Sequence, residues 1–158
     1  MLEMRVRGLC RCSQHPVPSI VLEDAASERL LAIGVPPGEA ERIAHEIGRR
    51  PVCDPSIFTA FVEALRFLGA GGLTPWLNLE GQEVIGLIGL GLPGRETVIR
   101  CAPRDVAVLA AVARMPVRIG DALARAIEAV QPDAEPCGEE CRQNVAQWLD
   151  RVRPGDFA

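Results

Sequence analysis

The chain of 158 residues contains no lysine and no tyrosine, and aromatic residues make up only 4% of it. All 17 basic residues are therefore arginines. This excludes a lysine or tyrosine nucleophile and the phosphate-binding lysine of a Walker-type loop. Because there are also only two histidines, a metal or catalytic site has to be built from carboxylates, cysteines and arginines.

Long apolar segments are absent as well. The longest, Val84–Leu92 and Val106–Ala113, are far shorter than a membrane span, and Met1–Arg7 contains no apolar stretch of the secretory type. The composition, 48% hydrophobic and 24% charged, provides enough apolar material for one folded core. We therefore expect a soluble cytoplasmic protein with no membrane partner.

The charge distribution argues against a broad nucleic-acid-binding face. The net charge is −4, and arginine is in excess only in the segments 1–18 and 95–125. Proteins that wrap a nucleic-acid backbone have an extended basic surface, which this composition does not provide. A small arginine patch formed by the two segments stays open as a contact to DNA or RNA; the alternative is arginine distributed for solubility.

Each half of the chain shows the same order of elements, three strands and then two helices. Turn residues separate the strands, and apolar residues recur at helical spacing after them. We expect strands at 4–12, 20–23, 29–35, 76–79, 83–92, 96–101 and 116–119, and helices that begin near Pro37, Asp54, Pro103 and Gly120. These elements predict an α+β domain with a mixed, mainly antiparallel sheet and two pseudo-duplicated units of three strands and two helices.

The C-terminal part differs from the rest. We expect residues 1–130 to form the domain, 131–138 to form a polar linker, and 139–152 to form a terminal helix. The apolar stripe of that helix, which includes Trp148 and Leu149, needs a surface to cover. That surface is either the domain itself or a second subunit, so a homo-oligomer stays open.

The order of several short motifs resembles the bifunctional nuclease (BFN) domain family of bacteria and plants, over nearly the whole chain. Each motif is weak alone, and the resemblance rests on their sequence and spacing. They are the opening strands Met4–Leu9 and Ile20–Asp24, then Arg29–Ile33 followed by Glu39-Ala40, Arg50-Pro51, Glu63–Leu65, Pro103 with Asp105 and Val106–Ala110, Pro116-Val117, Leu149-Asp150 and Pro154–Phe157.

The resemblance implies a nuclease that cleaves phosphodiester bonds in both DNA and RNA. The chain also departs from the family pattern: the Thr-His-Asp that follows Arg-Pro in the family is replaced here by 53–56, and the arginine before Pro103 is replaced by Ala102. A second function therefore stays open, in which a catalytically degenerate member serves as a binding or assembly module.

Glu39, Asp105 and Arg104 are the candidate site residues. Glu39 and Asp105 each come two residues after a proline at a predicted strand-to-helix junction, so a pseudo-duplicated fold would bring the two carboxylates together. Such carboxylates can hold Mg²⁺ or Mn²⁺ for phosphodiester hydrolysis, and Arg104 can contact a phosphate. The alternative is that the acids only stabilise the first turn of their helices.

The six cysteines suggest a further, weaker site. Cys10, Cys12 and His15, together with Cys137 and Cys141, would supply soft ligands for zinc. This spacing matches none of the common zinc knuckles, so we do not expect zinc. The glycines of Gly86–Gly91 lie within a predicted strand and no helix follows directly, which indicates close packing rather than a phosphate-binding loop.

Overall fold

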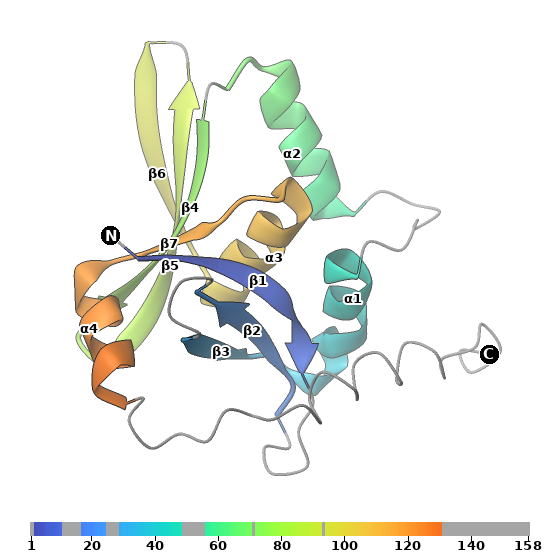
Figure 1. Ribbon diagram of the computed structural model, residues 1–158. Coiled ribbons are helices and arrows are strands. Elements are labelled where there is room, and N and C mark those ends of the chain that lie inside the picture. Colours follow the sequence, from blue (N-terminus) through green and yellow to red (C-terminus); the bar gives the residue numbers. More distant parts are fainter. Residues whose placement is uncertain are drawn as a thin grey trace, which may run out of the picture.

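The computed structural model describes residues 2–10, 17–24, 29–48, 56–70, 72–92 and 94–130, and it has an α+β fold (Figure 1). In chain order the elements are β1 (Leu2–Cys10), β2 (Ser19–Glu23), β3 (Leu30–Gly34), α1 (Pro37–Ile47), α2 (Ile57–Phe67), β4 (Gly72–Glu80), β5 (Glu83–Leu92), β6 (Arg95–Cys101), α3 (Pro103–Ala113), β7 (Val117–Ile119) and α4 (Asp121–Val130). The predicted order of three strands and two helices in each half is confirmed, with β7 added between the two helices of the second half.

One mixed sheet of seven strands, in the order β3-β2-β1-β7-β4-β5-β6, forms the centre of the fold. The two meanders β1–β3 and β4–β6 lie on either side of β7, which pairs antiparallel with β1 and parallel with β4. All other strand pairs are antiparallel. The expected mixed, mainly antiparallel sheet is therefore confirmed.

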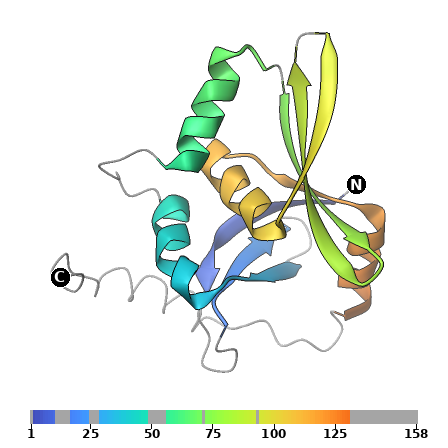
Figure 2. The same ribbon diagram turned by 180° about the vertical axis from the view of Figure 1, so that it is seen from behind.

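The helices α1, α2 and α3 lie together on one side of the sheet, and α4 lies apart from them, near the N-terminal end of β1 (Figures 1 and 2). Helix α3 is buried along its length at Val106–Ala110, because it packs between the sheet and the neighbouring helices. A Cβ atom added at Gly86 of β5 would lie 2.6 Å from Val106 Cγ2. The glycine therefore permits the close approach of α3, as the sequence indicated.

Helix α2 begins at a serine cap and ends at Phe67. Its N-cap is Ser56, whose side-chain oxygen accepts a hydrogen bond from the Thr59 amide at 3.1 Å. Asp54, near which this helix was expected to begin, lies outside the described residues, as does the predicted helix 139–152. The helix ends before Leu68, which is its C-cap and is exposed.

Among the helices in the described parts of the chain, none is long and apolar enough to span a bilayer.

Candidate functional site

The first turns of α1 and α3 provide the candidate site. Both helices have proline at the start and an acid in the first turn, Glu39 in α1 and Asp105 in α3. Neither N-cap residue, Pro36 or Ala102, caps its helix with a side chain. The carboxylates therefore lie where the positive ends of the helix dipoles stabilise negative charge.

Arg104 lies against both carboxylates. Its Nε atom is 3.3 Å from Glu39 Oε2 and 3.8 Å from Asp105 Oδ1. The Nε–H is not directed at either oxygen in hydrogen-bond geometry, although the atom itself is buried. The structure thus brings together the three residues that the sequence singled out, which we call the Glu39–Arg104–Asp105 cluster.

The cluster is half-open to solvent and carries one uncompensated negative charge. The side chains of Arg104, Glu39 and Asp105 are 34%, 35% and 43% exposed, so water and a small anionic group can reach them. At this exposure each ion pair contributes on the order of 0.5 kcal/mol to folding. Chemically, the carboxylates can accept a proton, and the guanidinium can bind a phosphate through several N–H donors.

As arranged, the cluster does not fit a site for Mg²⁺ or Mn²⁺. A guanidinium already contacts both carboxylates, so a divalent cation would compete with it for the same oxygens. In the described part of the chain, no group of three or more histidine, cysteine, aspartate or glutamate side chains could hold a metal ion. We therefore assign no step of the chemistry to a metal.

Cys101, at the end of β6, adjoins the cluster and has a free thiol. Partial burial, and after it the nearby Asp105 carboxylate, raise the pKa of the Cys101 thiol above its ordinary value. The thiol is therefore protonated at neutral pH and is a poor nucleophile. The sequence analysis did not connect Cys101 with the site, although its position two residues before Pro103 was a signal that it would adjoin it.

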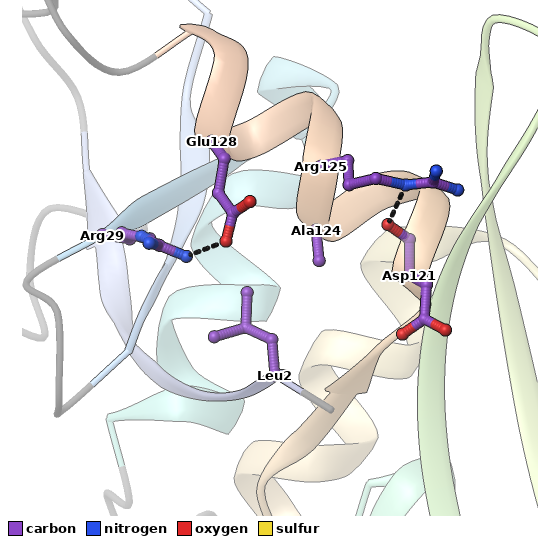
Figure 3. Close-up of a pocket in the computed structure, with 6 residues that line it drawn as sticks. All are labelled: Leu2, Arg29, Asp121, Ala124, Arg125 and Glu128. Atoms are coloured by element: carbon purple, nitrogen blue, oxygen red, sulfur yellow. Dashed lines mark hydrogen bonds and ion pairs between the residues drawn. The ribbon is translucent and has the colours of Figure 1, made fainter.

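A cavity of about 440 Å³ opens elsewhere, between α4 and the N-terminal end of β1 (Figure 3). Arg29 Nη1 lies 2.7 Å from Glu128 Oε1, and Arg125 Nε donates to the Asp121 carbonyl oxygen at 3.3 Å. Of the lining charges, Arg29 and Glu128 thus pair with each other, and the cavity shares no residue with the Glu39–Arg104–Asp105 cluster. We place the candidate site at the cluster because, among the ion pairs of the described residues, it is the one in which an arginine contacts two carboxylates.

Glu63, which belongs to one of the ordered motifs, does not join this site. Glu63 is exposed on α2 and pairs with Arg66, three residues along the helix. Of the residues considered for zinc, only Cys10 is within the described part of the chain, and it is disulfide-bonded. Glu63 and Cys10, the described residues among these, give no second catalytic constellation.

The comparison with known proteins gives no further assignment: no family model matches the chain, and no curated protein matches it.

Proposed function

We propose that this protein is a nuclease of the bifunctional-nuclease type that hydrolyses phosphodiester bonds in DNA and RNA at the Glu39–Arg104–Asp105 cluster. The observation that carries the proposal is the contact of Arg104 with the carboxylates of two different helix openings. The resemblance of the ordered motifs to the BFN family supplies the substrate class. The arginines of the chain provide the cations that a phosphodiester requires.

In this mechanism Glu39 acts as the general base. Its carboxylate accepts a proton from a water molecule, whose oxygen bonds to phosphorus while the bond from phosphorus to the leaving sugar oxygen breaks. Arg104 neutralises charge on the non-bridging oxygens; with five N–H donors it can contact a phosphate and keep its ion pair with Glu39. Asp105 also contacts Arg104 and helps to hold it, and solvent protonates the leaving oxygen.

The proposal is tested by assaying the full-length protein on single-stranded RNA and DNA. We expect Glu39→Gln to lower the cleavage rate at least about 100-fold, because a neutral amide cannot accept the proton. Glu41→Gln is the matched control: Glu41 lies on the same helix, is exposed, and is not part of the cluster. Thermal unfolding of both variants should match the wild type within a few degrees.

The same assay tests the expected metal dependence. Cleavage that persists after chelation and does not rise with added Mg²⁺ or Mn²⁺ agrees with a cluster in which Arg104 supplies the positive charge. Cleavage that requires the cation would show that Arg104 moves away from the carboxylates during the reaction. Absence of cleavage under every condition would refute the nuclease proposal.

The second candidate function is a non-catalytic binding or assembly module on the same fold. It is favoured by the ion pair between Arg104 on α3 and Glu39 on α1, which links two helices in the way a purely structural contact does. Under this proposal Glu39→Gln changes only the unfolding temperature. A wild-type protein that binds single-stranded nucleic acid without cleaving it would favour this function over the first.

A further inference from the structure

Trp76 of β4 lies on the face of the sheet opposite α1, α2 and α3. Its neighbours in the strand, Pro75 and Leu77, are fully buried, because the other face of β4 packs against α3. Side chains alternate along a strand, so Trp76 points away from this core, and 40% of it is exposed. The three helices lie together on the opposite side (Figures 1 and 2). They therefore leave a large aromatic ring open to solvent.

Strand pairing places Trp76 within a row of side chains that crosses four strands. Its Cα partners are Arg118 in β7 and Leu87 in β5, and Leu87 is paired in turn with Arg100 in β6. Residues that are paired directly in neighbouring strands lie on the same face of a sheet. We call Arg118, Trp76, Leu87 and Arg100 the Trp76 row. It consists of an aromatic and an apolar side chain between two arginines.

Exposed ion pairs hold the two arginines of the Trp76 row. Arg118 Nε lies 3.7 Å from Glu3 Oε1, and Arg100 Nη1 lies 2.7 Å from Glu80 Oε2. All four side chains are between 40% and 61% exposed, so another anion can replace either carboxylate at little cost. Arg5 is exposed two residues beyond Glu3 on the same face of β1 and forms no ion pair among the described residues. The row thus offers cations to an anionic ligand.

An exposed aromatic ring between two arginines fits single-stranded nucleic acid. Neighbouring strands lie about 4.8 Å apart, so the backbones of Arg118 and Arg100 are separated by about 14 Å, with Trp76 between them. A four-stranded sheet of this width accommodates about two or three nucleotides. An unpaired base stacks on an aromatic ring, and arginine binds the phosphates on either side. A duplex does not fit, because its bases are stacked on one another.

The Arg100 end of the Trp76 row leads to the Glu39–Arg104–Asp105 cluster. Arg100 precedes Arg104 by four residues, so their Cα atoms are at most about 14 Å apart. β6, which carries Arg100, is the last strand of the sheet. A nucleic-acid strand that continues past Arg100 therefore reaches Arg104 within a few nucleotides.

We infer that the Trp76 row binds single-stranded nucleic acid next to the cluster, with one base stacked on Trp76 and phosphates bound by Arg118 and Arg100. The inference rests on the proposed function and narrows its substrate to unpaired strands. Glu3 and Glu80 compete with the phosphates for the two arginines, so removal of either carboxylate strengthens binding.

The test is the affinity of the full-length protein for a short labelled oligothymidine, measured by fluorescence anisotropy. Trp76→Ala should weaken binding at least about fivefold, whereas Trp76→Phe, which keeps an aromatic ring, should weaken it much less. Arg118→Gln and Arg100→Gln should each lower the slope of log affinity against log salt by about 0.7, because each removes one phosphate contact. Trp76→Ala should leave that slope unchanged.

The exposed pair Glu63–Arg66 on α2 supplies the matched controls. Arg66→Gln removes the same charge as Arg100→Gln but should change neither the affinity nor the salt slope. Glu80→Gln should strengthen binding about two- to fivefold, because it frees Arg100, whereas Glu63→Gln should not. A gain in affinity at Glu80 cannot result from a loss of folding.

The same titration in the Glu39→Gln variant separates this inference from the proposed function. Binding as expected, with no cleavage by the wild type, would refute the nuclease and keep the Trp76 row. Cleavage by a wild type whose affinity is unchanged in Trp76→Ala would keep the nuclease and overturn the row. No binding of oligothymidine, or equal affinity for a duplex, would also overturn it. Equal affinity for an oligoglutamate peptide would do the same and indicate an acidic protein partner.

Discussion

Gly86 and Gly89 lie three residues apart on β5, but only one of these positions has room for a side chain. A Cβ atom at Gly86 would lie 2.6 Å from Val106 Cγ2, 2.8 Å from the Cys101 carbonyl oxygen and 2.9 Å from that of Ala102. At Gly89 the corresponding distances to Thr74 begin at 3.5 Å, which is ordinary contact. The first glycine is thus required by the packing of α3, whereas the second is not.

We predict that Gly86→Ala lowers the free energy of unfolding by about 1–3 kcal/mol, because backbone oxygens and a packed helix cannot easily move aside. Gly89→Ala should change it by less than about 0.5 kcal/mol. Urea denaturation followed by circular dichroism measures both. If both variants lowered the free energy of unfolding equally, the close approach of α3 would not be the reason why the glycine at position 86 is needed.

Cys101 provides a second prediction for a single residue. Burial and the Asp105 carboxylate raise the pKa of its thiol, so at a given pH the native protein has less thiolate than an ordinary cysteine. We expect slow alkylation of the Cys101 peptide by iodoacetamide, with a midpoint shifted to higher pH than in the denatured chain. Asp105→Asn should shift this midpoint downward, toward that of the denatured chain, whereas Asp121→Asn should not. Mass spectrometry of the peptide gives the rates.

The candidate residues themselves could be found from the sequence, but the contact that Arg104 makes could not. The repeated proline and acid at the two strand-to-helix junctions identified Glu39 and Asp105 as equivalent positions. Arg104 was expected to face a phosphate, and its ion pair with Glu39 was not expected. That partner lies 65 residues earlier in the chain, and a pairing of this kind depends on how α1 packs against α3.

Helix α2 begins differently from α1 and α3. Helices α1 and α3 begin with proline and an acid, whereas α2 begins with Ser56, whose oxygen accepts from the Thr59 amide. A cap of this kind satisfies an amide that has no partner within the helix.

We predict that Ser56→Ala destabilises the protein by about 0.5–2 kcal/mol, whereas Ser56→Asp, which keeps an accepting oxygen, changes stability much less. Thermal unfolding of the two variants measures this difference. If Ser56→Asp destabilised the protein as strongly as Ser56→Ala, the cap would not be the cause.

Strand positions were largely predictable from turns and alternation, and strand order was not. β5 has the predicted bounds, Glu83–Leu92, because glycine-containing turns define both of its ends. The position of β7 at the centre of the sheet was not predicted. β7 has only three residues, and its neighbours β1 and β4 are distant in the sequence, so no local pattern records the pairing.

At the scale of the whole molecule, β7 joins the two meanders into one folding unit. Val117 and Ile119 are buried, and Ile119 pairs with Leu2 on one side and with Leu77 on the other. Arg118, between them in the strand, is partly exposed, and its Nε atom lies 3.7 Å from Glu3 Oε1. Substitutions on the buried face of β7 should therefore destabilise both halves of the sheet.

We predict that Ile119→Ala lowers the free energy of unfolding by about 2–5 kcal/mol, whereas Arg118→Ala costs less than about 1 kcal/mol. Hydrogen exchange measured over a urea series should show β2 and β5 losing protection together in both variants. Separate transitions for the two strands would show that each meander folds on its own, against a joining role for β7.

The central place of β7 also has a consequence for synthesis of the protein. A ribosome makes β1 first and β7 only after more than a hundred further residues, yet β1 and β4 are held in one sheet through β7. Until Val117–Ile119 emerge, the inner edge of β1 has no native neighbour, and nascent chains with such open edges are prone to aggregate. The order of synthesis thus leaves this edge of the N-terminal meander open until the last strand of the sheet is made.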